Sequence, residues 1–374
     1  MDLDLTNEQQ LLQDSVRGIC TGEMDLQAVR RAEARPETAE GFRQKLNSIG
    51  LPGIRIPVEH GGAGLGLTEA VVAFFELGRA IAPTALLESS VMAPALLSSF
   101  NGPDSSTLLE GIANGALTVV PTWHEPAGSG LEDVQCKVSF DAGVAKVDGE
   151  KTFVPHFVIA NYLLVPARDT QNDLAICVVD TSAGGITETR LSNLAGEPLS
   201  KLAFRQTPVK AVLTPAANVE DGWTRMVEEG LVALAAFAAG GAQRVLDMSR
   251  EYACEREQFG KRIAEFQSIA HYLADAAVET DSAYLLAYRA ASEADKGLPY
   301  GYWASVAKLH AGKTFRDVSA LAIQIHGGLG FTLEGDPQLF FRRSKHLQLI
   351  LGDPGKLERD IEDYLFTRNT SLYA

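Results

Sequence analysis

The sequence predicts an α+β fold with an N-terminal α domain, a middle β domain and a C-terminal helical bundle. Apolar residues recur at helical spacing up to about residue 115. Short strand-like runs then follow one another to about residue 215, separated by Gly, Pro and Asp, with no helical stretch between them. Long Ala-rich segments begin near residue 219. The chain is long enough for several domains, which we expect to cover 1–115, 116–218 and 219–374.

A helix-capping pattern opens the N-terminal domain. Thr6 stands three residues before Gln9, which is the spacing of a capping box, and apolar residues follow at helical intervals. Glycines at 61, 62, 64 and 66 predict a loop. After this loop, Thr68 is placed to cap a second helix that ends near Ala82-Pro83.

Six strand-like runs predict the middle domain. They cover Leu117–Pro121, Cys136–Phe140, Val144–Val147, Tyr162–Val165, Leu174–Val179 and Val209–Leu213. Asp141-Ala142-Gly143, between the second and third runs, predicts a hairpin turn. Short strands without intervening helices favour an antiparallel barrel or sandwich.

Four helical segments predict the C-terminal domain. They run from Val227 to Glu255, from Gln267 to about Lys296, from Tyr302 to about His326, and from about Lys356 onward. Glycines at 327, 328 and 330 interrupt the pattern after the third segment. Long helices joined by short loops predict an antiparallel bundle.

The charge balance limits the possible partners. The chain holds 33 Lys and Arg against 48 Asp and Glu, so its net charge is −15 and we expect no nucleic-acid or membrane partner. A local basic patch can still hold an anionic ligand. The N-terminus lacks the basic stretch and apolar core of a signal peptide, and the longest apolar run, Leu231–Gly241, is too short for a bilayer. We therefore expect a cytoplasmic location.

The four cysteines, Cys20, Cys136, Cys177 and Cys254, lie far apart and form no CxxC pair. This spacing predicts reduced and mostly buried thiols rather than a zinc site or a disulfide framework. We expect no metal site.

Several residues near the start of the second long C-terminal segment suit a flat, phosphorylated ligand. Arg256 offers a planar fork of donors for a pyrophosphate. Phe259, three residues on, is expected on the same helical side and can cover a flat ring, while Gln267 supplies an amide. Gly327 and Gly328 allow a backbone to approach a ligand closely.

Each of these residues also has a purely structural interpretation. An arginine such as Arg256 is more often a surface ion-pair partner, and a Gly-Gly pair is usually a helix C-cap. His326 is expected to be a packed or capping residue, because no nucleophile or carboxylate stands near it in a triad pattern.

Three C-terminal segments together resemble the acyl-CoA dehydrogenase family. They are Gly241-Ala-Gln-Arg-Val-Leu-Asp followed by Arg256-Glu-Gln-Phe-Gly-Lys-Arg-Ile-Ala-Glu-Phe-Gln267, then Gln324-Ile-His-Gly-Gly-Leu-Gly-Phe-Thr-Leu-Glu334, then the Arg342-Arg343 pair. The glycine-rich loop at 61–66 and Glu76-Leu-Gly-Arg79 also resemble that family. The resemblance covers nearly the whole chain and implies a middle β-barrel domain, a C-terminal four-helix bundle and a bound FAD.

The resemblance also implies roles for single residues. Arg256, Phe259 and Gln267 match residues that bind the flavin across a subunit interface, and Gln324 and Gly328 match residues that contact its nucleotide part. Gly327, which allows close backbone approach, is assigned to the same cofactor site. The family chemistry is α,β-dehydrogenation of an acyl-CoA thioester, in which a carboxylate removes an α proton and the β hydrogen leaves as hydride to the flavin. The implied partners are an acyl-CoA substrate and an electron-transfer flavoprotein as acceptor.

The base of the family has no counterpart here. Leu351 occupies the usual base position, and the position used in another branch falls on Gly230. Displaced candidates are Glu229, Asp353 and Glu88, although their structural interpretations are stronger. Glu229 lies near a helix start, Asp353 fits a turn or cap, and Glu88 is expected to be solvated.

The middle domain departs from the family as well. His124-Glu-Pro-Ala-Gly-Ser-Gly130 stands where the family has a T-E-P-G-A-G-S-D stretch. Phe153-Val154-Pro155 replaces a Trp-Ile-Thr that flanks the flavin in the family. Phe153 is expected to form an apolar surface beside the flavin ring, while Pro155 lacks a backbone N–H donor where the family has a hydroxyl.

A retained body without a base is similar to the smaller subunits of heteromeric acyl-CoA dehydrogenases of the pimeloyl-CoA or steroid side-chain type. This predicts a heterotetramer in which a second acyl-CoA dehydrogenase subunit carries the base. Two alternatives stay open: a self-sufficient homotetramer with Glu229 or Asp353 as a displaced base, and a structural subunit without flavin.

Overall fold

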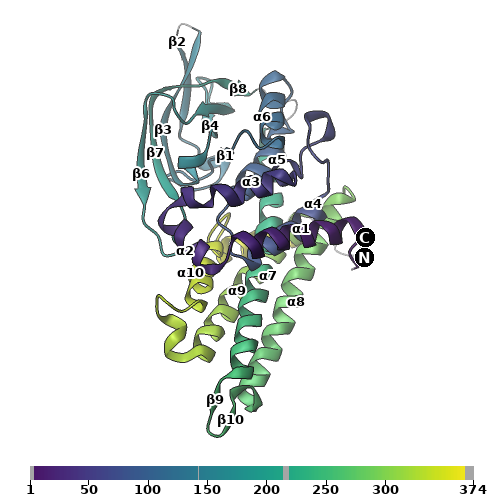
Figure 1. Ribbon diagram of the computed structural model, residues 1–374. Helices are drawn as coiled ribbons and strands as arrows, with labels where there is room; N and C mark the ends of the chain where they lie inside the picture. Colours follow the sequence, from purple (N-terminus) through teal and green to yellow (C-terminus); the bar gives the residue numbers. More distant parts are fainter. Residues whose placement is uncertain (1–3, 142, 214–218, 367–374) are drawn as a thin grey trace. The chain divides into compact units, whose positions relative to one another are not determined.

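The computed structural model describes residues 4–141, 143–213 and 219–366, which form two compact units (Figure 1). Unit 1 contains Met1–Ala32, Gly66–Ala82 and Leu231–Ala374, and unit 2 contains Glu33–Leu65 and Pro83–Gly230. The chain therefore has the predicted helical, β and helical parts, while the domain limits at 115 and 218 stay a prediction.

The first helix of unit 1, α1 (Asn7–Glu23), begins as predicted. The Thr6 hydroxyl accepts a hydrogen bond from the Gln9 amide at 3.2 Å, and the Thr6 amide donates to the Gln9 side chain at 3.0 Å. This reciprocal pair satisfies two backbone donors that the helix itself leaves unpaired, and so fixes where the helix starts.

The second predicted cap, at Thr68, is wrong. The N-cap of helix α4 (Leu67–Arg79) is Gly66, two residues before Thr68. The Asp295 carboxylate of helix α8 accepts from the Leu67 amide at 2.6 Å and from the Thr68 amide at 2.9 Å. A residue 228 positions away therefore supplies the capping oxygens, and no local pattern could predict it.

Long helices build the rest of unit 1 (Figure 1). The described elements are α2 (Leu26–Ala34), which ends in unit 2, α7 (Val219–Glu255), which enters from unit 2, α8 (Gln267–Asp295), α9 (Gly301–His326), α10 (Pro337–Leu347) and α11 (Pro354–Phe366). The hairpin β9 (Glu257–Gln258) and β10 (Lys261–Arg262) joins α7 to α8. The three long predicted helices are confirmed, and α10 was not predicted.

Close backbone contact joins α4 to α7. A Cβ on Gly78 would lie 2.0 Å from the Phe237 carbonyl oxygen, and a Cβ on Gly240 would lie 1.9 Å from the Phe75 carbonyl oxygen. Two glycines on facing helices thus let the backbones approach more closely than any side chain allows. The small residues of this α7 stretch are packing contacts.

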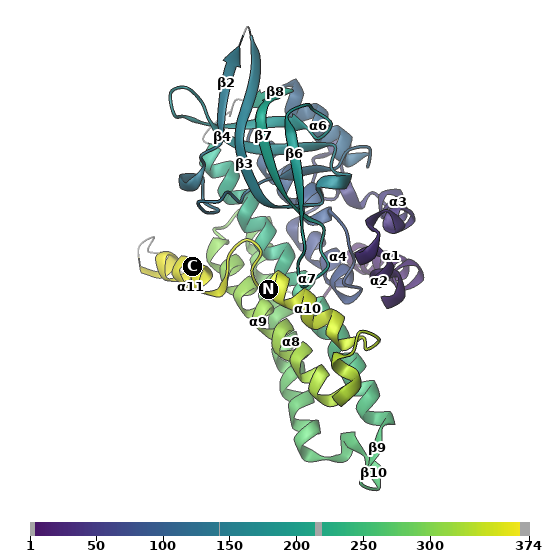
Figure 2. The ribbon, with the colours of Figure 1, turned by 90° about the vertical axis from the view of Figure 1, so that its left-hand side faces the viewer.

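A large sheet dominates unit 2 (Figure 2). It has eight strands, with neighbours in the order β6-β7-β3-β2-β4-β5-β8 and with β1 paired to β4. The strands are β1 (Val119–Pro121), β2 (Lys137–Asp141), β3 (Val144–Pro155), β4 (Tyr162–Arg168), β5 (Leu174–Asp180), β6 (Ile186–Leu191), β7 (Leu199–Pro208) and β8 (Ala211–Leu213). Most pairs are antiparallel, but β1 runs parallel to β4. Within the described residues, no pairing closes the path from β6 to β8 into a barrel.

The remaining helical elements of unit 2 are short. They include α3 (Glu40–Ser48), the π-helical turn η4 (Leu87–Met92), α5 (Ala93–Leu97) and α6 (Pro103–Ala113), besides several short 3-10 helices. The core of the sheet is aliphatic, with Val120, Leu163, Val179 and Leu202 fully buried.

By length and composition alone, helix α7 is long and apolar enough to cross a membrane. The uninterrupted apolar run Leu231–Gly241 is shorter than the helix and did not predict this. In the structure, 83% of its most apolar window is buried. This burial matches the core helix of a soluble protein.

Candidate functional site

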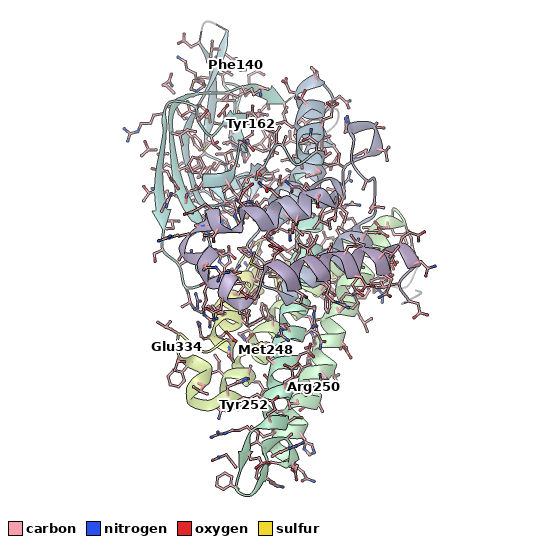
Figure 3. All side chains as sticks on the ribbon, in the orientation of Figure 1. Phe140, Tyr162, Met248, Arg250, Tyr252 and Glu334 are labelled. Carbon is pink, nitrogen blue, oxygen red and sulfur yellow. The ribbon has the colours of Figure 1, made fainter. Side chains whose placement is uncertain are left out.

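Three helix ends of unit 1 come together where the predicted cofactor residues lie. The hairpin β9–β10 places the end of α7 beside the start of α8, and the Ile263 amide donates to the Arg256 carbonyl at 2.9 Å. The end of α9 joins them through Tyr252 and His326, whose rings stack with centroids 4.3 Å apart and planes at 22°. Figure 3 labels Tyr252 on α7. Segments more than seventy positions apart in sequence therefore share one end of the bundle.

Phe259 does not lie on a helix with Arg256, contrary to the expectation from their spacing. Helix α7 ends at Glu255, and Phe259 and Gly260 form the hairpin turn with φ values of 55° and 81°. Such left-handed pairs are typical of two-residue hairpin turns. The Phe259 side chain is 93% exposed, so a large apolar ring is presented outward from the turn.

The polar members of this end have donors available for a ligand. Gln267 is exposed as the first residue of α8, and Gln324 is exposed in the last turn of α9. Within the described ranges, the exposed Arg256 guanidinium forms no ion pair. A guanidinium, two amides and an exposed aromatic ring suit the phosphates and flat rings of a flavin dinucleotide.

The turn after α9 leaves space at its surface. Gly327 has φ 61° and ψ −136°, a conformation that a side chain disfavours, and its amide donates to the Gln324 carbonyl. A Cβ on Gly327 or Gly328 would meet nothing within 4 Å, so the backbone is open to approach. Gly330 differs, because a Cβ there would lie 2.6 Å from the Ile323 carbonyl oxygen.

His326 is a packed residue, as predicted. Besides stacking on Tyr252, its Nδ1 lies 2.8 Å from the Ala322 carbonyl oxygen, to which a protonated Nδ1 donates. The ring is held by its own helix, which leaves it no part in a catalytic triad.

In unit 2, Phe153 lies within strand β3, where the register with β7 shifts between Lys151 and Val154. Its φ is 51°, its side chain is 54% exposed, and its ring meets the His124 ring edge-on at 5.7 Å. A non-glycine residue with positive φ is uncommon and often marks a functional position. The Thr152 amide donates to the His124 carbonyl at 2.9 Å, and this hydrogen bond joins the Phe153 segment of β3 to the His124–Gly130 stretch.

A buried ion pair fixes the same stretch. Lys151 is fully buried and its Nζ lies 2.6 Å from Glu125 Oε1, while the Gln135 amide donates to the other Glu125 oxygen at 2.7 Å. Removing either charge would leave the other unpaired in the interior. The pair holds His124 and Phe153 in place, and its only sequence signal was that Glu125 aligned with the family's Glu.

The position expected from the resemblance to hold the base has an unusual backbone and holds leucine. Leu351 is 6% exposed and has φ 56°, and Gly352 after it has φ 129°. Lys308 of α9 is buried and donates to the carbonyls of Gln348, at 2.9 Å, and Gly352. Burial lowers the pKa of Lys308 to about 7, while the negative Asp353 acts in the opposite direction.

Two of the three displaced base candidates are engaged in structural contacts. Glu229 is buried, and Arg55 contacts both of its oxygens at 3.0 and 3.2 Å while Arg225 donates to one at 2.9 Å. Asp353 accepts from the Lys356 amide at 3.0 Å and caps α11, and backbone hydrogen bonding holds its pKa below the usual range. Both carboxylates are held by structural partners, and ionic or backbone hydrogen bonds occupy their oxygens.

Glu88 is buried, which contradicts the expected solvated position. Its carboxyl is 5% exposed in the π-helical turn η4, and its Oε2 has no hydrogen-bond partner among the described residues. His156 Nε2 lies 3.9 Å from that oxygen. Burial raises the pKa of Glu88 to about 8, and the negative Glu197 adds to the rise. π-helical turns occur frequently at functional sites.

Cys20, Cys136 and Cys177 are buried free thiols, and Cys254 is exposed. Burial raises the pKa of each buried thiol to about 12, so none of the three is a reactive thiolate at neutral pH. Across the described part of the chain, no three His, Cys, Asp or Glu side chains gather as metal ligands.

Comparisons with known proteins agree with the fold and identify the family. Residues 6–115 match the acyl-CoA dehydrogenase N-terminal domain, and residues 221–361 match the acyl-CoA dehydrogenase C-terminal domain. The probable acyl-CoA dehydrogenase YngJ of Bacillus subtilis is 30% identical over 370 residues, which span 93% of this chain and 95% of that protein.

Two similar solved structures are named as assemblies of two proteins. A variant of the Tcur3481-Tcur3483 steroid ACAD is 27% identical with a TM-score of 0.86, covering 97% of this chain and 99% of that chain. The ChsE4-ChsE5 complex from Mycobacterium tuberculosis is 23% identical with a TM-score of 0.88, covering 98% and 100%. An acyl-CoA substrate and an electron-transfer flavoprotein acceptor are typical of the acyl-CoA dehydrogenase family. The chain belongs to the acyl-CoA dehydrogenase family and is a FAD-dependent oxidoreductase that acts on the CH–CH bond of acyl-CoA thioesters.

Proposed function

We propose that this chain is the base-lacking subunit of a cytoplasmic, heterotetrameric acyl-CoA dehydrogenase whose second subunit type carries the base. The observation that carries the proposal is Leu351, an apolar side chain in the loop where the family places its carboxylate. The loop around it keeps its backbone geometry through Lys308. A leucine there cannot accept the α proton, so the carboxylate must come from elsewhere.

The residues proposed to hold FAD are Arg256, Phe259, Gln267, Gln324, Gly327, Gly328 and Phe153. The Arg256 guanidinium pairs with the pyrophosphate, and the exposed Phe259 ring covers a flat ring of the cofactor. When bound, FAD supplies the acceptor for the β hydrogen as hydride. Arg256 reaches the flavin of a neighbouring subunit, so the chain is required for turnover without a base of its own.

The name of one relative supports the heteromeric arrangement. Tcur3481-Tcur3483, which is 27% identical to this chain, is named by two proteins and is called a steroid ACAD. We therefore propose that the present chain acts in the catabolism of steroid or other bulky acyl-CoA thioesters, with an electron-transfer flavoprotein as the electron acceptor.

Co-purification with a second acyl-CoA dehydrogenase subunit tests the proposal. The complex should contain FAD, and anaerobic acyl-CoA should bleach its visible absorption, whereas the chain alone should show no bleaching. Replacing the partner subunit's base carboxylate should abolish bleaching. Full bleaching by the chain alone would rule the proposal out.

A second candidate function rests on Glu88. A buried carboxyl with one unpartnered oxygen and a pKa of about 8 has the properties of a general base. On this alternative, the chain is a self-sufficient homotetramer. Glu88→Gln should then abolish bleaching by the isolated chain, which the heteromeric proposal predicts to be inactive already.

A further inference from the structure

We infer that Tyr252 and His326 are positioning residues that clamp the two FAD-holding ends of unit 1 at a fixed spacing. The inference rests on the proposed function, because it takes Arg256 on one segment and Gln324 to Gly328 on the other as cofactor contacts. It goes beyond that proposal because neither ring is a proposed ligand of the cofactor.

The geometry links each ring directly to a binding segment. Tyr252 lies in the last turn of α7, and its carbonyl accepts from the Arg256 amide at 2.9 Å. His326 is the last residue of α9 and is followed immediately by Gly327. The ring centroids of Tyr252 and His326 lie 4.3 Å apart. The stack therefore connects the segment that leads to Arg256 with the residue that precedes Gly327.

The His326 ring is also held by its own helix, independently of Tyr252. Its Nδ1 contact with the Ala322 carbonyl, at 2.8 Å, ties the imidazole to the preceding helical turn. On the other side, the Arg256 carbonyl accepts from the Ile263 amide, so the start of the hairpin is held too. The Tyr252 segment and the His326 segment are each held by their own hydrogen bonds, and the stacked rings connect the two segments.

Helix ends need such a contact because they fray more readily than helix interiors. A dinucleotide that touches both segments binds tightly only when their spacing is already set, since ordering them on binding reduces the affinity. Both rings are only partly buried, so the pair lies at the rim of the bundle rather than in its core.

The test uses the FAD-containing complex and a double-mutant cycle. Tyr252→Leu and His326→Leu should each raise the FAD Kd several-fold, Tyr252→Phe should keep it within about twofold because the stack remains, and the double Leu variant should be no weaker than the worse single one. Tyr302→Leu is the matched control, because Tyr302 contacts the Trp303 ring at 4.9 Å near the opposite end of α9 and should not change FAD binding.

Hydrogen exchange on the full chain without added FAD gives a readout independent of the cofactor. Tyr252→Leu should speed exchange at residues 256–259 and 327–328, and Tyr252→Phe should not. Unchanged exchange, or Leu variants whose effects on the FAD Kd simply add, would overturn the clamp. If Arg256→Ala leaves the FAD Kd unchanged while the exchange result holds, the proposed cofactor site fails and the clamp stands.

Discussion

Replacing Glu88 by Gln removes a buried carboxyl whose pKa lies far above its ordinary value. Burial moves the pKa of Glu88 from 4.5 to about 8 in the folded chain. Between these two values the native state binds more protons than the unfolded state, so stability falls as the pH rises through this window. At about 1.4 kcal/mol per pKa unit, the loss by pH 8 reaches at most roughly 5 kcal/mol.

Glu88→Gln keeps the shape of the neutral carboxyl but cannot ionise. We expect the variant to match the wild type near pH 5 and to exceed its free energy of unfolding by several kcal/mol above about pH 8. His156 and Glu197 are the titratable groups that face this carboxyl, so His156→Gln serves as the control for histidine titration.

Urea unfolding at about pH 5, 7 and 8.5 measures the difference directly. The two stability curves should separate as the pH rises, and they should still separate in the His156→Gln background. Parallel curves across the range would refute the reasoning, because they would mean that Glu88 ionises in the folded chain as easily as in water.

Three further changes have defined outcomes. Gly240→Ala should lower the free energy of unfolding by about 1–3 kcal/mol because its Cβ would overlap the Phe75 carbonyl, whereas Gly18→Ala, in open space on α1, should be neutral or stabilising; chemical unfolding that ranks them the other way would contradict the close helix contact. Lys308→Met should abolish the rise in stability between about pH 7 and 10.5 that a buried lysine with a pKa of about 7 produces, and a variant that keeps the slope would show that another group causes it. Glu229→Gln should cost about 3 kcal/mol, since Arg55 loses its buried partner, and a stable variant would show that the pair is dispensable.

Local patterns predicted the elements whose signals lie within a few residues. The capping box at Thr6, the long helices α7, α8 and α9, and the apolar strands β4 and β5 follow from such signals. Strand β6 was not predicted because its run Ile186–Leu191 alternates partly buried and exposed residues that are mostly polar. Strand β7 was not predicted either, although Leu202 and Phe204 alternate with less buried residues in it. Helix α10 was not predicted either, although Leu339, Phe340 and Leu347 recur at helical spacing and are buried.

Most of the site depends on contacts that no short pattern contains. Glu125 and Lys151 are 26 positions apart, and Lys308 reaches a loop more than 40 positions later. Phe259 was expected on a helix, and the turn that exposes it depends on Gly260 and on a left-handed phenylalanine. The sequence singled out the segments that are proposed to hold the cofactor, but only the fold revealed that the Glu88 carboxyl is buried and that the Tyr252 ring stacks on the His326 ring.

The FAD affinity of the Arg256→Ala complex tests the central claim most directly. Arg250→Ala is the control, because Arg250 is an exposed arginine on the same helix, as Figure 3 shows. Loss of a charged phosphate contact costs about 2–3 kcal/mol, so the FAD Kd should rise by roughly 30-fold or more in Arg256→Ala and stay unchanged in Arg250→Ala. Equal FAD affinity in both variants and the wild type would contradict the assignment of this end of the bundle as the cofactor site.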